Sequence, residues 1–343
     1  MENVAVLGAG SWGTALAIVL GDNGHKVKLW TLDQGDAHRL NLKKENIKFL
    51  KGCKIPPNVH ATSDLGEALF EAKAVVISVP SHAVRSVLKK AGKYIHEDAF
   101  VVNSAKGFEL DSLKRLSHVI KEELPRSMHD NVAVLSGPSH AEEVGARMPT
   151  AVVAASKHRA VAEFVQDIFI NNRFRVYTNP DIAGVELAGA LKNVIALAAG
   201  MADGLGFGDN TKSALMTRGI VEIARLGVCM KAHFTTFAGL TGIGDLIVTC
   251  TSMHSRNRRA GIQLGQGREL EDILKDMGMV VEGVKTTKAA YLLASKHQVE
   301  MPITEQVHRV LYQGLNPADG VNNLMGRDRT KEMEELALHG MGW

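Results

Sequence analysis

The chain has 343 residues, of which 45% are hydrophobic and 22% are charged, so it has an ordinary globular composition and is long enough for two domains with sizeable cores. Its formal net charge of +3 is too small to indicate a nucleic-acid partner or an acidic membrane surface. The cysteines are odd in number and far apart, which predicts neither a disulfide framework nor a metal site: Cys53, Cys229 and Cys250.

The chain carries no pattern typical of export or membrane insertion. No basic segment followed by an apolar run precedes the first predicted strand, so we expect no signal peptide. The most apolar helical stretch, Val194–Met201, is short and lies between Lys192 and Asp203, which argues against a membrane span. We therefore expect a cytoplasmic protein without an integral membrane segment.

The first half of the chain alternates apolar runs with helical patterns. The predicted strands are Asn3–Leu7, Val27–Trp30, Ala74–Val79, Phe100–Asn103, Val132–Ser136, Thr150–Ala155 and Phe174–Tyr177. The predicted helices are Trp12–Asn23, Asp36–Glu45, Leu65–Glu71, Ala83–Tyr94, Ser112–Glu123, Ala141–Gly145 and Ala160–Ile170. This alternation predicts an α/β fold of the Rossmann type, a doubly wound and mostly parallel sheet with helices on both faces.

After Asn179-Pro180 the pattern becomes helical, and no further strand is predicted. The predicted helices are Asp181–Asp203, Thr211–Lys231, Arg258–Leu264, Leu270–Met277, Thr286–Lys296, Ile303–Leu311 and Ala318–Leu324. We therefore predict two domains, a dinucleotide-binding domain at 1–180 and an all-α substrate-binding domain at 181–343. We expect the charged tail from Gly326 to be mobile.

The first predicted strand runs into a glycine pattern, Gly8-x-Gly10-x-x-Gly13. Gly8 permits a tight turn, Gly10 lets the backbone approach a pyrophosphate, and Gly13 lets the following helix pack close to the strand. Such a pattern alone is weak evidence, and a glycine turn without a ligand is the alternative. The strand before it and the helix after it favour a dinucleotide site.

Asp33 follows the second predicted strand and lies 20 residues beyond Gly13. An acidic residue at this position accepts hydrogen bonds from the adenosine ribose and favours NAD over NADP. Asp33 fits equally well as the cap of the helix that is predicted to begin near Asp36. The residues alone therefore leave the choice between NAD and NADP open.

Residues after other strands are further candidates, because ligands lie beyond the carboxyl ends of strands in such sheets. Pro80 and Ser81 suit a helix start, although their loop could also flank a cofactor. Lys106 could hold a phosphate or an oxyanion, or be a surface lysine in a turn. Ser139 and Glu142 resemble a capping box, whose backbone N–H groups could also bind a substrate.

The helical half adds three candidates. Lys192 lies among Ala, Leu and Gly, which is unusual for a solvated charge, although it could extend to the surface. Asp245 follows a glycine loop and precedes an apolar run, as an N-cap does. The run Ser255–Asn257 combines a cation with hydroxyl and amide groups, which suits a phosphate dianion but also a basic surface turn.

Each of these motifs is weak evidence alone, but their combination and order along the chain are specific for one family. The chain closely resembles the NAD(P)-dependent glycerol-3-phosphate dehydrogenases of the bacterial biosynthetic type. The resemblance extends over essentially the whole chain. Its landmarks are Gly8-Ala-Gly-Ser-Trp-Gly-Thr, Ser104-Ala-Lys-Gly, Ser136-Gly-Pro-Ser, Leu191-Lys-Asn-Val, Gly244-Asp-Leu, Ser255-Arg-Asn-Arg, Val281-Glu-Gly and Met301-Pro-Ile-Thr.

The resemblance implies reversible reduction of dihydroxyacetone phosphate to sn-glycerol 3-phosphate with NADH or NADPH, for glycerophospholipid synthesis, in an enzyme that is often a homodimer. It implies that Lys192 is the catalytic proton donor or acceptor. The implied substrate site contains Lys106, Gly137, Ser139, Lys192, Asn193, Asp245, Thr249, Ser255, Arg256 and Asn257. The cofactor site contains Gly8, Gly10, Ser11, Trp12, Gly13, Asp33, Lys106, Ala141, Arg256, Val280 and Glu282.

One local departure and two alternative functions stay open at this point. Leu32-Asp33 stands where relatives often carry a polar or basic residue, which leaves the cofactor preference undecided. A related two-domain dehydrogenase acting on 6-phosphogluconate or ketopantoate is the nearer alternative. A non-catalytic dinucleotide sensor is the other, but it would not need Lys192, Asp245 and Arg256 together.

The ionisation of Lys192 also stays undecided by the sequence. Burial and the nearby cations Lys106 and Arg256 would lower the pKa of Lys192, whereas Asp245 would raise it. Reduction of a ketone needs the ammonium form, and the reverse oxidation needs the neutral amine.

Overall fold

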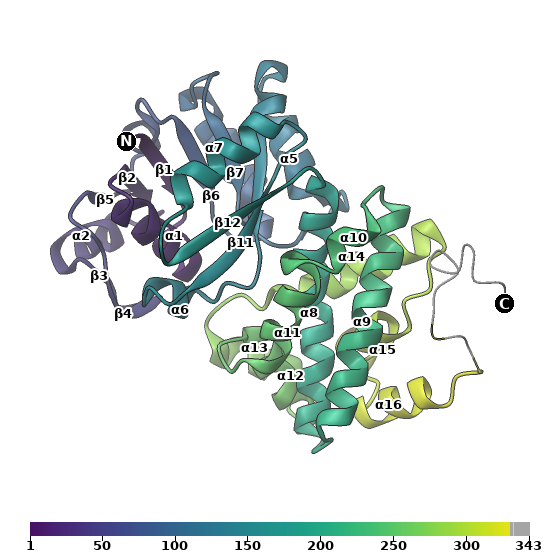
Figure 1. The fold of residues 1–343 in the computed structure, drawn as a ribbon. Helices are drawn as coiled ribbons and strands as arrows, with labels where there is room; N and C mark the ends of the chain where they lie inside the picture. The colour runs from purple at the N-terminus through teal and green to yellow at the C-terminus, as the bar shows by residue number, and fades with distance from the viewer. Residues whose placement is uncertain (330–331, 333–343) are drawn as a thin grey trace.

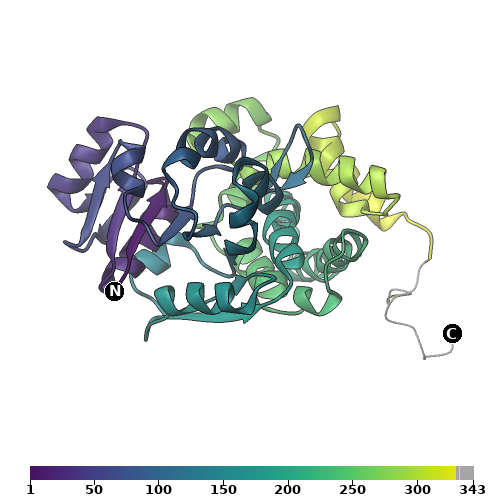
Figure 2. The ribbon, with the colours of Figure 1, turned by 90° about the horizontal axis from the view of Figure 1, so that it is seen from above.

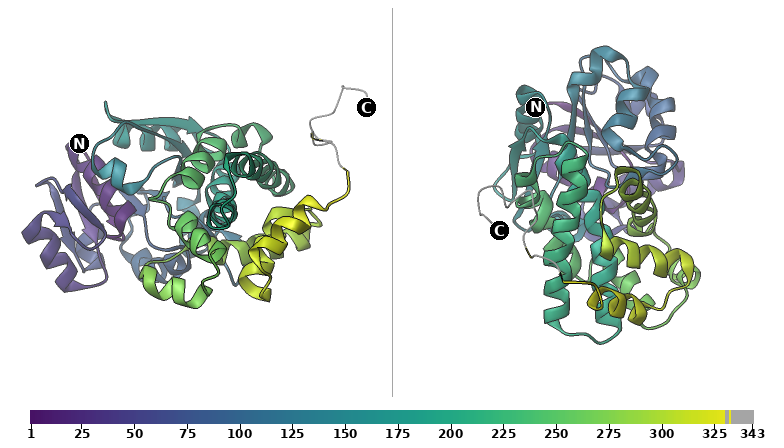
Figure 3. Two further views of the ribbon diagram at one scale, coloured as in Figure 1. Left: turned by 90° about the horizontal axis from the view of Figure 1, so that it is seen from below. Right: turned by 90° about the vertical axis from the view of Figure 1, so that its right-hand side faces the viewer.

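The computed structural model describes residues 1–329 and 332, so most of the charged tail that we expect to be mobile lies outside the described residues. A sheet with its covering helices, residues 1–180, is followed by a helical region from residue 181 (Figure 1). We call these the sheet region and the helical region. Figures 2 and 3 show the first strands and the last helices at opposite ends of the molecule.

Eight strands form one sheet in the order β12-β11-β10-β7-β6-β1-β2-β5, and only β10 and β11 pair antiparallel. The strands are β1 (Asn3–Leu7), β2 (Lys26–Trp30), β5 (Val59–Thr62), β6 (Ala74–Ile77), β7 (Phe100–Asn103), β10 (Val132–Ser136), β11 (Thr150–Ala155) and β12 (Phe174–Asn179). The predicted mostly parallel sheet is confirmed. The chain winds outward in both directions from β1, which places the loops after β1 and β6 side by side.

The edge strand β5 and two short hairpins were not predicted from the sequence. The hairpins pair β3 (Glu45–Asn46) with β4 (Leu50–Lys54), and β8 (Phe108–Glu109) with β9 (Lys114–Arg115). These segments are short and mix polar with apolar residues, so they lack the apolar runs that identify the central strands.

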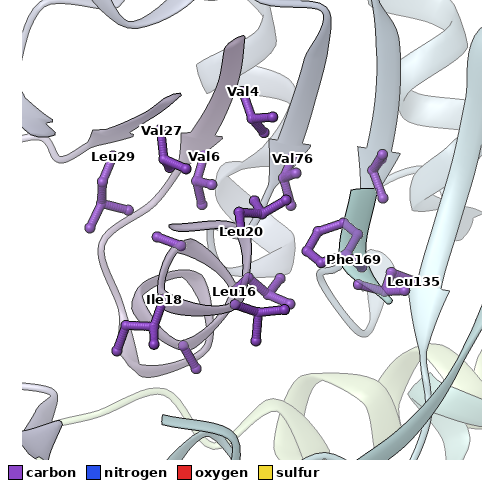
Figure 4. Close-up of a cluster of buried hydrophobic side chains, with 14 of the residues drawn as sticks. Val4, Val6, Leu16, Ile18, Leu20, Val27, Leu29, Val76, Leu135 and Phe169 are labelled. Atoms are coloured by element: carbon purple, nitrogen blue, oxygen red, sulfur yellow. The ribbon is translucent and has the colours of Figure 1, made fainter. Parts of the chain in front are cut away.

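Helices cover both faces of the sheet. They are α1 (Ser11–Asp22), α2 (Gln34–Lys43), α3 (Leu65–Leu69), α4 (Val84–Ala91), α5 (Leu116–Glu123), α6 (Ala141–Gly145) and α7 (Arg159–Phe169). Figure 4 shows Leu16 and Leu20 of α1 among Val4, Val6 and Val76 of the strands. A separate apolar cluster on the opposite face contains residues of α3, α4 and α5. Burial on both faces explains why the central strands are continuously apolar.

The helical region is built around α8 (Ile182–Gly204). The other helices are α9 (Asp209–Cys229), α10 (Phe234–Phe237), α11 (Asp245–Thr251), α12 (Arg256–Gly265), α13 (Leu270–Met277), α14 (Glu282–His297), α15 (Pro302–Gln313) and α16 (Pro317–Met325), with a π-helical turn at Leu240–Gly244. Among the described residues from 181 onward no strand occurs, as predicted. Asp181 caps α8 by accepting a hydrogen bond from the Gly184 N–H at 2.8 Å.

Two stretches, α8 and residues 234–251, are long and apolar enough to cross a membrane by length and composition, which alone is weak evidence. In α8, 94% of the apolar window is buried inside the protein. Helix α8 also carries two buried charged side chains, Glu186 and Lys192. These features are those of the central helix of a folded core.

Helices α8 and α12 touch through their backbones (Figure 1). A Cβ atom on Gly200 would lie 2.2 Å from the Arg258 carbonyl oxygen, and one on Gly261 would lie 2.2 Å from the Leu197 carbonyl oxygen. No side chain larger than hydrogen fits at either position. The glycines therefore fix the separation of the two helices.

Helix α8 also joins the two regions. The Glu186 carboxylate accepts hydrogen bonds from the Ser117 N–H at 2.7 Å and the Ser117 hydroxyl at 2.6 Å, which satisfies the start of α5. It also pairs with Arg115 at 2.7 Å, and both side chains are largely buried. The beginning of α8 is thus held against the sheet region by an ion pair and two hydrogen bonds.

Candidate active site

A cleft of about 1090 Å³ lies beyond the carboxyl ends of the strands, where the sheet region meets the helical region. Its walls are the glycine loop after β1, the end of β2, the loops after β6, β7 and β10, and parts of α8, α11, α12 and α14. The predicted site residues that line it are Gly8, Gly10, Ser11, Trp12, Lys106, Ser139, Ala141, Lys192, Asn193, Thr249, Ser255, Arg256, Asn257, Val280 and Glu282. The fold thus gathers predicted residues from the two halves of the chain around one cavity.

Four predicted site residues lie just outside the lining: Gly13, Asp33, Gly137 and Asp245. A Cβ atom on Gly13 would lie 1.9 Å from the Gly8 carbonyl oxygen, so Gly13 permits the helix to pack against the strand end. Gly137 has a φ of +145°, and a Cβ atom there would lie 2.9 Å from the Cα of Val152. Both glycines support the loops that form the walls.

The glycine loop fits a pyrophosphate. Gly8 has a φ of +118° and turns the chain out of β1. Gly10 is the N-cap of α1 and provides no capping side chain, and a Cβ atom there would meet no described atom within 4 Å. The first N–H groups of α1 therefore face open space, as required for binding a phosphate anion. A side chain at Gly10 would fill this space.

Buried polar atoms in and beside the glycine loop also fit a cofactor. Within the described residues, Trp12 Nε1 and Ser78 Oγ are buried without a hydrogen-bond partner, and both residues line the cleft. A buried donor or hydroxyl without a protein partner is rare in folded proteins, and a bound ligand can supply the missing hydrogen bond.

Asp33 is observed as a helix cap. Its Oδ1 accepts a hydrogen bond from the Asp36 N–H at 2.7 Å, at the start of α2. Asp33 therefore caps α2, which is one of the two roles that the sequence predicts for it. The binding of a ribose by Asp33 stays a prediction, and nothing in the cap prevents it.

Two lysines and one carboxylate form a cluster at the cleft, in which Lys192 and Asp245 are buried and Lys106 is partly buried. Lys192 Nζ donates hydrogen bonds to Asp245 Oδ1 and, at 2.7 Å, to Thr249 Oγ1. Lys106 Nζ donates to Asp245 Oδ2 at 2.7 Å and to the Gly137 carbonyl oxygen at 3.2 Å. The exposed fraction is 6% for Lys192 and 1% for Asp245. The attraction of both ammonium groups to the Asp245 carboxylate compensates part of the free energy that their desolvation costs.

Several local interpretations of the sequence were wrong here. Lys192 does not extend to the surface, and Lys106 is not a solvated turn lysine, because both pair with Asp245. Asp245 is not an N-cap: the cap of α11 is Gly244, and the carboxylate turns inward. The pairing is invisible locally, since Asp245 lies 53 residues from Lys192 and 139 from Lys106.

Burial is the largest effect on the pKa of Lys192. Loss of hydration lowers it, Asp245 raises it, and Lys106 lowers it further, with a net pKa of about 7. Burial also lowers the pKa of His140, which lines the cleft and lies near Lys192. The amine of Lys192 can therefore exchange a proton near neutral pH, as a general acid or base must.

The start of α12 forms a second polar group in the cleft. Ser255 caps this helix by accepting from the Arg258 N–H at 3.2 Å. Asn257 donates to Asn193 Oδ1 at 2.8 Å and accepts from the Gly283 N–H at 2.9 Å. These contacts join α8, α12 and α14 and turn the start of α12 toward the cleft.

Arg256 reaches the cleft from the same helix start. Its guanidinium donates to the Val280 carbonyl oxygen at 2.9 Å, and burial lowers its pKa. The alternative of a basic surface turn is wrong for Arg256, because the side chain is directed into the cleft wall rather than into solvent.

The capping box expected at Ser139 and Glu142 is absent from this part of the described chain. Helix α6 begins at Ala141 with His140 as its N-cap, and no side chain caps it. The Ser139 hydroxyl instead donates to the Gly137 carbonyl oxygen at 3.0 Å. The helix begins too late for the Ser139–Glu142 spacing to form the reciprocal bonds.

Two residues beside the site, Ser81 and His140, were not among the predicted site residues. Ser81 donates from its N–H and its hydroxyl to the Glu282 carboxylate at 3.2 and 2.8 Å, which connects the loop after β6 to α14. His140 lies beside the reactive cluster, and its Nε2 is 3.4 Å from the Val248 carbonyl oxygen. Their proximity to the site depends on long-range folding, and only their position after strand ends could have indicated it.

The two halves of the chain match the two halves of one protein family. Residues 3–162 match the family model "NAD-dependent glycerol-3-phosphate dehydrogenase N-terminus", and residues 181–322 match "NAD-dependent glycerol-3-phosphate dehydrogenase C-terminus". The chain is 59% identical to glycerol-3-phosphate dehydrogenase [NAD(P)+] of Pelotomaculum thermopropionicum, over 98% of this chain and 96% of the relative. It is 55% identical to that of Bacillus subtilis, over 98% and 97%.

Solved structures agree with the sequence relatives. The glycerol-3-phosphate dehydrogenase of Coxiella burnetii superimposes with a TM-score of 0.90 at 38% identity, over 95% of this chain and 99% of that chain. A ketopantoate reductase from Ralstonia eutropha superimposes with a TM-score of 0.59 at 15% identity, over 93% and 99%, which shows a shared fold alone. With both halves matched and near full-length relatives above 50% identity, the chain belongs to the NAD-dependent glycerol-3-phosphate dehydrogenase family.

Proposed function

We propose that the chain reduces dihydroxyacetone phosphate to sn-glycerol 3-phosphate, reversibly, with NADH or NADPH, and so supplies glycerophospholipid synthesis. The observation that carries this proposal is the cluster of Lys192, Asp245 and Lys106 in a cleft that also contains a pyrophosphate-binding loop. A non-catalytic sensor would need the loop but not the cluster.

The cofactor is assigned to the sheet side of the cleft. The first N–H groups of α1 would bind the pyrophosphate, with Ser11, Trp12 and Ala141 beside it. Arg256, Val280 and Glu282 would contact the cofactor from the helical region, Lys106 would contact it from the loop after β7, and Asp33 would receive the adenosine ribose. When bound, the reduced nicotinamide supplies a hydride to the substrate carbon.

Lys192 is the proposed proton donor. Hydride addition leaves negative charge on the carbonyl oxygen of the substrate, which an ammonium group stabilises and then protonates. Asp245 and Thr249 accept hydrogen bonds from the Lys192 ammonium and so hold it in place. Because the pKa of Lys192 is about 7, the ammonium for reduction and the amine for oxidation are both present at neutral pH.

Binding of the substrate phosphate is assigned to the start of α12. Arg256 provides a cation, and Ser255 and Asn257 provide polar groups, with Asn193, Ser139 and Lys106 around the remaining substrate atoms and Gly137 in the loop beside them. Such contacts are remote from the reacting carbon, and their binding energy can position the ketone for hydride transfer.

We further propose a domain boundary at residues 180–181, a homodimer and a cytoplasmic location. The boundary is supported by the end of β12 at Asn179 and the start of α8 at Ile182. The resemblance to the family supports the dimer. Light scattering during size-exclusion chromatography tests it, and a monomer at micromolar concentration would refute it.

The reaction is tested by steady-state oxidation of NADH and NADPH with dihydroxyacetone phosphate. We expect Lys192→Ala to lower kcat by about 10³-fold, because the proton donor and its charge are lost. Arg256→Ala should mainly raise KM, and Lys296→Ala, which removes an exposed lysine of α14, should change neither.

Three outcomes would contradict the assignments. A near-normal kcat for Lys192→Ala removes it as the proton donor, and an unchanged KM for Arg256→Ala removes it from the phosphate site. Activity on 6-phosphogluconate or ketopantoate instead of dihydroxyacetone phosphate selects the alternative dehydrogenase. Tight cofactor binding without turnover of any of these substrates selects the sensor.

A further inference from the structure

We propose that this chain selects NAD over NADP, and that the selection comes from the paired acidic residues Asp33 and Asp36 at the start of α2. The kinetic part of this inference rests on the proposed function, whereas its binding part does not. The glycine loop sets where the dinucleotide lies. The end of β2 determines whether the adenosine ribose can carry the 2′-phosphate that distinguishes NADP from NAD.

The end of β2 reaches the cleft next to Asp33. Trp30, Thr31 and Leu32 line the cleft, and Asp33 follows them directly. Leu32 is 81% exposed, and its side chain has no polar atom to bind a phosphate. An adenosine in the cleft therefore meets an apolar side chain and then a carboxylate at this position.

The cap of α2 leaves one oxygen of Asp33 available. Oδ1 accepts the hydrogen bond from the Asp36 N–H, whereas the described residues give Oδ2 no hydrogen-bond partner, and 65% of the side chain is exposed. The cap thus orients the carboxylate while Oδ2 can accept from a ribose hydroxyl. Capping and ribose binding, which were alternatives from the sequence, are compatible in the folded chain.

The same arrangement disfavours an added 2′-phosphate. A phosphate dianion at the ribose would face the negative charge of Asp33. It would also lose the N–H of Asp36, because Asp33 already occupies that donor. At the start of α2 a phosphate would therefore meet a carboxylate, and this backbone N–H group would not be available to bind it.

The nearest cation to Asp33 is already paired. Arg39 forms an ion pair with Asp36 and lies 4.0 Å from Asp33 Oδ1. Two carboxylates thus share this guanidinium, and Asp36 has a second cation, Lys48, at 3.8 Å. Lys90, which also lines the cleft, belongs to α4, which follows β6, and β1 separates β6 from β2.

The inference is tested by direct binding of NADH and NADPH to the full chain without substrate, followed by the quenching of tryptophan fluorescence. Trp12 and Trp30 line the cleft and serve as the probes. We expect wild type to bind NADH at least about tenfold more tightly than NADPH, since one charge-assisted hydrogen bond separates the two. The ratio of kcat/KM with dihydroxyacetone phosphate should show the same preference.

Two variants separate the acidic charge from the helix cap. Asparagine also caps helices, so Asp33→Asn keeps the cap and removes the charge. It should tighten NADPH binding and weaken NADH binding, for a combined change of about tenfold or more in the ratio. Adding Asp36→Asn frees Arg39 and should move the ratio further toward NADPH. Asp64→Asn is the matched control, because Asp64 caps α3 in the same way.

The outcomes are distinguishable. Equal or tighter binding of NADPH by wild type overturns the inference, and so does an equal weakening of both cofactors in Asp33→Asn. A change of ratio in Asp64→Asn equal to that in Asp33→Asn also overturns it. A binding preference for NADH without turnover of dihydroxyacetone phosphate supports the inference and refutes the proposed reaction instead.

Discussion

Lys192 should lose the proton that ketone reduction consumes as the pH rises above neutrality. Burial beside Lys106 lowers the pKa of Lys192 to about 7, despite the ion pair with Asp245. The active ammonium form is then half populated at pH 7, and its population falls about fivefold by pH 8 and about tenfold more by pH 9. We expect kcat/KM for dihydroxyacetone phosphate to fall about fifty-fold between pH 7 and pH 9.

The assay is the loss of NADH absorbance at saturating cofactor, from pH 6 to 9.5, with subsaturating substrate. The dianionic phosphate of the substrate becomes a monoanion by gaining one proton near pH 6, so the acid limb is expected to report the substrate. His140 cannot cause the alkaline limb, because burial lowers its pKa and it is already neutral there. Oxidation of sn-glycerol 3-phosphate needs the amine, so its kcat/KM should rise with pH through the same pKa.

A profile that stays flat to pH 9.5 would refute this reasoning. It would mean either that Lys192 keeps the ordinary lysine pKa despite its burial, or that another group donates the proton. The reverse reaction separates these cases. A rise of kcat/KM for oxidation with a pKa near 10.4 supports an unperturbed lysine, and no alkaline dependence in either direction removes Lys192 from the proton transfer.

Three further predictions concern the neighbours of Lys192, the contact between α8 and α12, and the ion pair of Glu186. Lys106→Met should move the alkaline limb to higher pH and Asp245→Asn should move it to lower pH, because these neighbours lower and raise the pKa of Lys192; a shift in the same direction for both would contradict this. Gly200→Ala should lower the free energy of unfolding by about 1–3 kcal/mol in urea, because its Cβ would press on α12, whereas Gly92→Ala, whose Cβ would have an ordinary 3.5 Å contact, should not. Glu186→Ala should lower it by about 3 kcal/mol, because Arg115 and the start of α5 lose their buried partner, and an unchanged urea midpoint would count against that clamp.

The sheet could be predicted from the sequence because its central strands are buried on both faces. Ala74–Ile77 is apolar at every position, and the glycine loop predicts which strand end binds the cofactor. The edge strand β5 could not be recognised, since Val59-His60-Ala61-Thr62 mixes polar with apolar residues. Local pattern thus predicts the strands whose environment is uniform and misses those at the margin.

The candidate site shows a different limit. The composition around Lys192 indicated an unusual lysine, but neither its burial nor its partner could be derived from neighbouring residues. The glycines before Asp245 predict a helix cap at this residue. In the structure, the Asp245 carboxylate instead points inward and pairs with two lysines from distant segments. Residue types identified the participants, and only the fold determined which side chains compensate each other's charge.

The glycine contact between α8 and α12 has a consequence for substrate size. Lys192 and Asn193 lie on α8, and Arg256 and Asn257 lie at the start of α12, so the two backbones hold the proposed proton donor and the proposed phosphate anchor at one separation. Mutations that enlarge or trim the cleft side chains would leave that separation unchanged. A longer ketose phosphate would therefore be accommodated only by a change that moves the helices apart, and the four facing glycines Gly200, Gly204, Gly261 and Gly265 are where such a change would have to occur.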